Sequence, residues 1–139
     1  MAHELYLTDA PSPDDLAIVS GGLTAFNEGE VGPSDRKLLA VLIRDESGTV
    51  IGGLSGYTSW GWLFTQLLFI PETLRGKGMA AKLLTEAENE ARTRGCKGAW
   101  IDKFNPLALK AYKSHGYQVF GEIPNFVETR TRTFLQKAL

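Results

Sequence analysis

A glycine-rich segment in the middle of the chain limits the possible folds more than any other feature. The apolar residues Leu68-Phe69-Ile70 and Pro71 precede Arg75-Gly76-Lys77-Gly78-Met79-Ala80, and a helical pattern then begins. Glycines let a backbone approach a bulky anion, because no Cβ intervenes. A helix start offers unpaired N–H groups and the positive end of the helix dipole, which suit phosphate oxygens. This strand–loop–helix segment predicts a pyrophosphate site, to which Arg75 and Lys77 add positive charge.

Two common phosphate-binding motifs do not describe this loop. A P-loop needs Ser or Thr after its Gly-Lys pair, whereas Lys77 is followed by Gly78. The spacing of Gly76, Gly78 and Ala81 fits the dinucleotide pattern G-x-G-x-x-A, but that pattern is weak alone and here lacks a repeated βαβ context. The loop by itself therefore leaves the ligand open.

Length and composition restrict the class of protein. The 139 residues predict one domain over 1–139, and 43% hydrophobic with 22% charged residues is typical of a soluble globular protein. The net charge of −1 gives no basic surface for nucleic acid, and no apolar run approaches the roughly 20 residues that cross a membrane. The single cysteine, Cys96, excludes an internal disulfide and favours a cytoplasmic location.

The remaining pattern alternates strands and helices, which predicts an α/β fold with six or seven strands and three or four helices. The glycine pair Gly21-Gly22 lies inside the first helical pattern. We interpret it as a bend between two helical pieces rather than as a mobile lid, and we expect a loop over 27–37. The expected strands are 5–7, 38–44, 49–58, 63–70, 98–102, 117–122 and 130–137, and the expected helices are 12–26, 78–94 and 105–116, with a loop at 123–129.

Two predicted elements carry further detail. Gly52, Gly53 and Gly56 lie inside the strand 49–58 and indicate bulges or a close approach by another segment. The helix 78–94 has one apolar face, and its charges form two favourable i,i+4 pairs that we expect in solvent, Glu88–Arg92 and Glu90–Arg94. The residues expected to be buried on this helix are Ala80, Leu83, Leu84, Ala87 and Ala91.

A second motif lies downstream. Asn105-Pro106 is a good helix start, Tyr112 follows seven residues after Asn105, and Gly116-Tyr117 end the helix. This segment resembles the N-x-x-A-x-x-x-Y-x-x-x-G-[F/Y] pattern of the GCN5-related N-acetyltransferase (GNAT) superfamily. The loop also resembles that family's [Q/R]-x-x-G-x-[G/A] motif, which Arg75, Gly78 and Ala80 match. The two motifs span 68–117 in the family's order.

The resemblance implies a three-layer fold whose mixed central sheet separates around an acetyl-CoA cleft. By analogy, the backbone of Leu68-Phe69-Ile70 would meet the pantetheine arm, and Arg75 to Ala80 would hold the pyrophosphate. Asn105 would bind pantetheine, and Tyr112 would lie near the sulfur. The implied reaction moves an acetyl group from acetyl-CoA, as co-substrate, to an amine acceptor that we expect to be a small molecule.

This chemistry needs few groups. A neutral amine attacks the thioester, strand N–H groups stabilise the oxyanion, and a phenol can protonate the departing thiolate. Tyr112 is therefore the candidate general acid, although a tyrosine on the inner face of a helix can also be a plain core residue. A non-catalytic acyl-CoA sensor is the alternative function, and a Rossmann-type nucleotide binder is a third.

The general base is open, because the strand 63–70 contains no acid. An amine that arrives neutral would need no strong base. Otherwise the base could be a water held by Gln66 and backbone carbonyls, or one of four acids that stand near the expected cleft or near the first helix. These acids are Glu28, Glu30, Glu72 and Asp102. We interpret Glu72 as an exposed loop residue, and Asp102 could equally be a structural turn residue.

The remaining reactive residues predict little further chemistry. His3 and His115 have no ligand-spaced company, so we predict no metal site. Cys96 has no partner base, and we expect no covalent acetyl-cysteine route. Trp60 and Trp62 could line the acceptor pocket, lie in a homodimer interface, or simply be one exposed and one packed aromatic side chain.

Overall fold

The computed structural model describes residues 2–139, which form two compact units. The first unit ends at Ser34 and the second begins at Asp35. The predicted α/β class is confirmed, with six strands and three α-helices in the described residues. The elements are α1 (Pro13–Val31), β1 (Lys37–Arg44), β2 (Val50–Ser59), β3 (Trp62–Phe69), the 3₁₀ turn η1 (Glu72–Leu74), α2 (Met79–Thr93), β4 (Gly98–Lys103), α3 (Pro106–Ser114), β5 (Gln118–Val127) and β6 (Arg130–Ala138).

The first unit consists of an irregular stretch and helix α1. Ser12 caps the helix by accepting a hydrogen bond from the Asp15 N–H, as predicted. The bend expected at Gly21-Gly22 is wrong, because the helix continues to Val31 and so also replaces the start of the expected loop 27–37. The strand expected at 5–7 is also wrong, because those residues pair with no other strand in the described chain.

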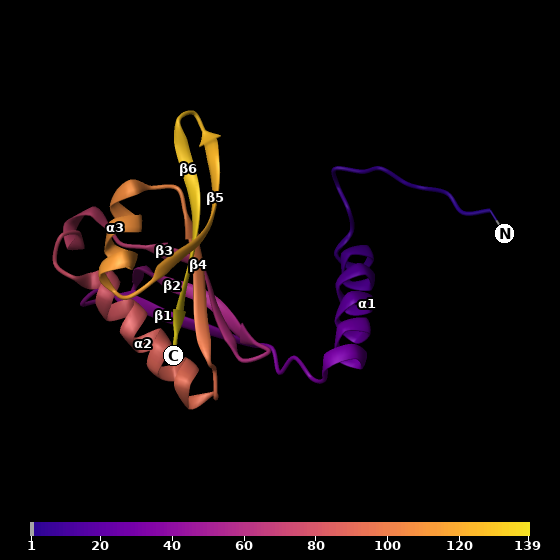
Figure 1. The fold of residues 1–139 in the computed structure, drawn as a ribbon, viewed down its shortest axis with the longest axis horizontal. Helices are drawn as coiled ribbons and strands as arrows, with labels where there is room; N and C mark the ends of the chain where they lie inside the picture. Colours follow the sequence, from indigo (N-terminus) through magenta and orange to yellow (C-terminus); the bar gives the residue numbers. More distant parts are fainter. Residues whose placement is uncertain (1) are drawn as a thin grey trace. The chain divides into compact units, whose positions relative to one another are not determined.

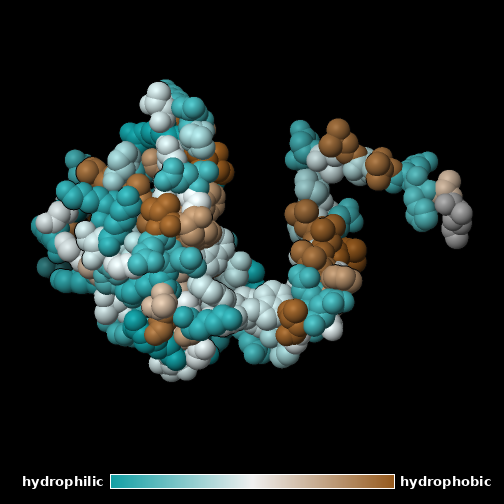
Figure 2. Space-filling model, in the orientation of Figure 1, coloured by the Kyte–Doolittle hydropathy of each residue, from teal (hydrophilic) through white to brown (hydrophobic). Residues whose placement is uncertain are grey.

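Helix α1 buries none of its residues. Apolar side chains cover much of it, as the brown atoms along this helix in Figure 2 show. The exposed apolar residues of α1 are Leu16, Ile18, Val19, Leu23, Phe26 and Val31.

The second unit is built on one mixed sheet with the strand order β1-β2-β3-β4-β6-β5 (Figure 1). Only the central pair β3–β4 is parallel, and α2 forms the connection between these two strands. All other neighbours are antiparallel.

Both helices of this unit cover the same face of the sheet. Helix α2 packs on β1, β2 and β3 and also contacts α3. One core joins α2, Tyr112 of α3 and inward side chains of five strands or their ends. Its fully buried members include Leu54, Leu63, Leu84, Ala87, Ala91, Ala99, Ile101 and Leu135. Phe64 and Trp100 are among the side chains that alternate to the opposite face of the sheet. No helix of residues 35–139 covers that face.

Strand β5 is longer than expected. It continues to Val127 and so replaces most of the loop predicted at 123–129. Two register shifts against β6 accompany this extension, and the strand lies at the edge of the sheet. An edge strand tolerates Pro124, because the missing N–H can face away from the ladder.

The prediction that the Glu88 side chain of α2 lies in solvent is wrong. Glu88 is only 2% exposed, and it accepts hydrogen bonds from the Tyr117 hydroxyl at 2.9 Å and from Lys137 Nζ at 2.7 Å. The expected pair with Arg92 is therefore absent, whereas the Glu90–Arg94 pair forms at 2.7 Å. A buried carboxylate is tolerated only when it is paired, and these partners are distant in sequence.

Candidate active site

A bulge in β3 lies where the central strands stop pairing. Ser55 pairs with Leu67 and Gly56 pairs with Thr65, so that Gln66 has no opposite residue. A Cβ on Gly56 would come within 1.9 Å of the Phe64 carbonyl oxygen, so only glycine fits beside this bulge. The sequence prediction of a close approach in this strand is thereby confirmed.

Beyond the bulge, β3 and β4 separate. Their pairing runs from Trp62–Gly98 to Thr65–Ile101, although β3 continues to Phe69 and β4 to Lys103. We call this separated end the fork and the Trp62–Gly98 end the closed end. The facing backbone groups in the fork have no partner from the opposite strand. In addition, the Thr65 hydroxyl is buried and has no hydrogen-bond partner in the described chain.

The glycine-rich loop follows the β3 arm of the fork. Gly76 and Gly78 both have φ of 73°, and nothing lies within 4 Å of the Cβ position of either residue. Gly78 is also the N-cap of α2, and no side chain caps that helix. The first N–H groups of α2, at Met79 and Ala80, are therefore available to a ligand. An open backbone with uncapped donors fits a pyrophosphate.

The two cations of this loop differ. Arg75 donates from Nε to the Ile70 carbonyl oxygen at 2.9 Å, so part of its guanidinium holds the turn together. Lys77 is exposed. Leu68 and Ile70 pack partly against the core, whereas Phe69 faces outward.

Helix α3 brings two predicted residues to the same unit. The Asn105 side-chain oxygen accepts hydrogen bonds from Leu107 N at 2.9 Å and Ala108 N at 3.4 Å, so the residue caps the helix as expected. Tyr112 is 1% exposed, and this burial raises its pKa to about 12. No hydrogen bond of the Tyr112 hydroxyl is found within residues 2–139, so the phenol keeps its donor for another partner.

The candidate bases have other partners or lie exposed. Glu28 accepts hydrogen bonds from the Ser34 N–H and hydroxyl, at 2.8 and 3.0 Å, which hold its pKa below the ordinary value. Glu28 and Glu30 belong to the first unit. Glu72 is exposed in η1, and Gln66 is the exposed bulge residue.

Asp102 lies at the fork and is paired with Arg132. Its Oδ1 atom accepts from Arg132 Nε at 2.8 Å and contacts Nη2 at 2.6 Å. It is the first β4 residue after the last β3–β4 pair. Sequence reasoning named Asp102 but missed Arg132, and nothing local in the sequence linked the two.

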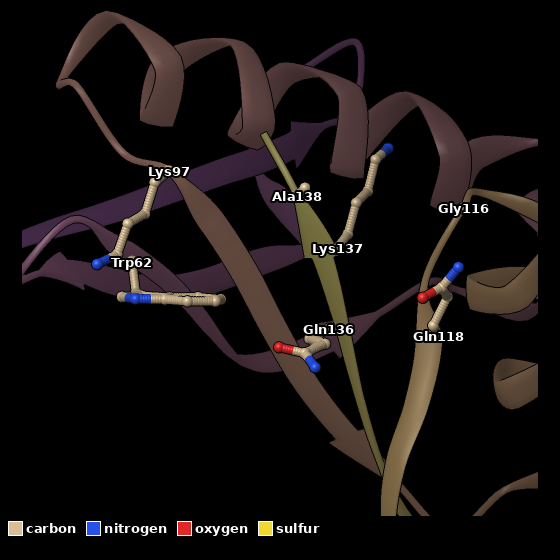
Figure 3. Close-up of a pocket in the computed structure, with 7 residues that line it drawn as sticks. All are labelled: Trp62, Lys97, Gly116, Gln118, Gln136, Lys137 and Ala138. Atoms are coloured by element: carbon tan, nitrogen blue, oxygen red, sulfur yellow. The ribbon is translucent and has the colours of Figure 1, made fainter.

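A pocket of about 600 Å³ lies away from these groups, at the closed end (Figure 3). Trp62 packs closely over Gly98 there, and Trp60 is 39% exposed in the preceding turn. Figure 3 shows Lys137 pointing away from Trp62 and Gln136, toward the helix that carries its partner Glu88. The pocket is lined by an aromatic ring, two amides, two lysines and two small residues, which are Trp62, Gln118, Gln136, Lys97, Lys137, Gly116 and Ala138.

Other classes of site receive no support from the described chain. Residues 2–139 contain no group of three or more His, Cys, Asp or Glu side chains that could hold a metal ion. Cys96 is buried, which raises the pKa of its thiol. None of the described helices is both long and apolar enough to span a bilayer.

Comparisons with known proteins agree with this geometry. The model of the acetyltransferase (GNAT) family matches residues 9–117. An acetyltransferase of Agrobacterium fabrum is 42% identical over 131 residues, which are 94% of this chain and 96% of the relative. The blasticidin-S acetyltransferase of Streptomyces morookaense is 34% identical over 95 residues, 68% of this chain and 70% of that protein.

Solved structures have the same fold. A protein of Agrobacterium tumefaciens described as an acetyltransferase is 40% identical and superposes with a TM-score of 0.94, over 99% of this chain and all of that one. An acetyltransferase of Bacillus cereus superposes with a TM-score of 0.82 over 96% of this chain and 98% of its own, and at 23% identity it supports the fold alone. The chain belongs to the acetyltransferase (GNAT) family.

Proposed function

We propose that the protein is an N-acetyltransferase that moves an acetyl group from acetyl-CoA to a small-molecule amine. The observation that carries this proposal is the fork, where two parallel strands stop pairing beside an open glycine loop. A long ligand with an anionic end and an amide-containing arm fits both features. The blasticidin-S acetyltransferase relative supports a small-molecule acceptor.

The residues that would hold acetyl-CoA follow from their free donors. Gly76 to Ala80 offer backbone N–H groups and a helix N-terminus to the pyrophosphate, and Lys77 adds a charge. The fork would bind the pantetheine arm through the backbone of Leu68 to Ile70 and through the Thr65 hydroxyl. The Asn105 oxygen is occupied by the cap, so its NH₂ group is the part that would reach pantetheine. Bound here, acetyl-CoA would supply an activated acyl carbon for a neutral amine.

Tyr112 would act on the departing sulfur. With a pKa of about 12 the phenol is protonated at neutral pH, so it can donate and cannot serve as a base. A thiol with an ordinary pKa near 8.5 holds its proton less tightly than this phenol, so complete transfer is uphill. The main contribution of Tyr112 is therefore a hydrogen bond that stabilises the developing thiolate.

The unpaired strand N–H groups of the fork would stabilise the oxyanion. They are fixed by the sheet and need no reorganisation during the reaction. No base is required of the protein if the acceptor arrives neutral, and Gln66 with nearby carbonyls could hold a water that removes the final proton.

The test is a CoA-release assay with the full chain and acetyl-CoA. The acceptor panel contains amino acids, polyamines, aminoglycosides and peptides, and calorimetry measures acetyl-CoA binding separately. We expect binding and turnover with at least one small amine. Thermal stabilisation by NAD and not by CoA would contradict the proposal and support a nucleotide binder instead.

A non-catalytic acyl-CoA sensor is the second candidate. It is favoured by the engagement of two acids, Glu28 with Ser34 and Asp102 with Arg132. Acetyl-CoA binding without turnover across the whole panel would support this sensor and refute the enzyme.

A further inference from the structure

An ion pair on the outer face of the fork has unused hydrogen-bonding capacity. Arg132 Nε and Nη2 both contact one oxygen, Asp102 Oδ1. A guanidinium has five N–H donors, and this contact uses only its side edge. The end edge, formed by Nη1 and Nη2, has a free pair of donors, and no contact of Arg132 Nη1 or Asp102 Oδ2 is found among residues 2–139.

The guanidinium is held in place by more than Asp102. Its central carbon lies 5.0 Å from the ring centre of Phe126 and 5.7 Å from that of Phe134. These aromatic contacts restrict the side chain and lower the entropy lost when a ligand binds. The side chains of Arg132 and Asp102 remain 36% and 16% exposed, so the pair is fixed yet reachable.

The pair faces away from the expected phosphate site. Ile101 points into the core under α2 and α3, so its neighbours Trp100 and Asp102 point to the opposite face of the sheet. Trp100 stacks on Phe64 there, with ring centres 3.9 Å apart and planes at 11°. A group held by Arg132 would therefore lie beside a flat apolar surface, one residue past the last β3–β4 pair.

The free end edge of the Arg132 guanidinium favours an anion. Asp102 neutralises one edge of the guanidinium, whereas Lys103 alternates to the face of Ile101 and adds no cation beside Arg132. A planar guanidinium edge with two free N–H donors matches a carboxylate in both charge and geometry.

We propose that Arg132 binds an anionic group on the acceptor, so that the acceptors are amines that carry a carboxylate or a comparable oxyanion. This inference rests on the proposed acetyl transfer. It assigns Arg132 to acceptor recognition, and it excludes polyamines and other purely cationic amines as good acceptors.

The experiment compares matched acceptor pairs, each an amino acid and its carboxamide, in the CoA-release assay. We expect the wild-type chain to favour the acid by about 10- to 100-fold in kcat/KM, the range of one charged bidentate contact. Arg132→Gln should reduce this preference to within about threefold, by raising KM for the acid and leaving KM for acetyl-CoA unchanged. Arg132→Lys should keep only part of the preference for the acid, because an ammonium group lacks the planar pair of donors of a guanidinium.

Two further variants keep the test decisive. Arg130→Gln removes the same charge from the same strand at an exposed position and should keep the wild-type preference. Asp102→Asn with Arg132→Gln removes both charges, so a loss of preference in a well-folded double variant cannot come from an unpaired, partly buried acid.

The outcomes separate this inference from the proposed function. Three outcomes overturn the inference and leave acetyl transfer standing. They are turnover without any preference for the acid, a preference that survives Arg132→Gln, and a change in KM for acetyl-CoA alone. Absence of CoA release with every acceptor overturns both.

Discussion

The two ends of the β3–β4 pair differ in what they offer a ligand. The closed end has the measurable hollow of about 600 Å³, lined by Trp62, Gln118 and Gln136 among others. The fork has an unpaired backbone and lies beside an open glycine loop, and it begins at Thr65, whose buried hydroxyl has no hydrogen-bond partner among residues 2–139. If the fork binds acetyl-CoA as proposed, unsatisfied polar groups locate the site better than concavity does, because an extended ligand completes a sheet rather than filling a cavity.

The largest effect should follow from removing the Tyr112 phenol. Tyr112→Phe should lower kcat by about 100-fold and leave the Kd of acetyl-CoA within about threefold, because the phenol acts on developing charge. Steady-state kinetics and calorimetry measure the two quantities. Tyr6→Phe, at an exposed residue of the first unit, is the control. A Tyr112→Phe protein with full activity would remove Tyr112 from the mechanism.

The next largest effect should come from filling the glycine loop. Gly78→Val places a β-branched side chain at a φ of 73° and a Cβ in the open position, so acetyl-CoA should bind about 10- to 100-fold more weakly. Gly48→Val is the matched control, since Gly48 has a φ of 85° and equally open surroundings in a distant turn. Equal losses of affinity in the two variants would show that strain, and not the loop, causes the effect.

A smaller effect concerns alkaline stability. The folded pKa of Tyr112 is about 12 against an ordinary value of 10, so above pH 10 the unfolded phenol ionises first and stability falls until pH 12. Below pH 10 this group contributes nothing to the pH dependence. At pH 11 the cost is about 1 to 2 kcal/mol. Urea unfolding at pH 8 and pH 11 should show a larger loss for wild type than for Tyr112→Phe, while Tyr6→Phe behaves as wild type. Identical losses in all three proteins would mean that the phenol is not desolvated.

The smallest effect is expected at the closed end. Gln136→Ala changes an exposed side chain of the pocket, so kcat/KM should stay within about twofold and stability within about 0.5 kcal/mol. A loss of activity above fivefold would make this pocket part of the functional site and would reverse the comparison between the two ends.

Features with local causes were predictable from the sequence. The helix start at Asn105-Pro106 and the glycine loop at Gly76 and Gly78 depend on neighbouring residues, and both form as expected. Features that depend on distant partners were not. Glu88 is buried because Tyr117 and Lys137 reach it from 29 and 49 residues away, and Asp102 is paired by a residue 30 positions later.

The errors at the N-terminal side have related physical reasons. A short apolar run such as 5–7 becomes a strand only if another strand is there to pair with it, which a sequence window cannot test. Helix α1 shows the reverse case, since it continues through Gly21-Gly22 although that pair disfavours a helix by about 1 kcal/mol per glycine.

The bulge at Gln66 also changes how this strand should be compared among relatives. Leu63 and Thr65 point into the core before it, and Leu68 and Ile70 do so after it, so the inward frame moves from odd to even residue numbers. Deleting Gln66 would remove the bulge and leave a regular strand in which Leu67 still pairs with Ser55, so Leu68 and Ile70 would keep facing the core. In a pairwise alignment, a gap at this position therefore marks the loss of the bulge and leaves the set of core-facing residues unchanged.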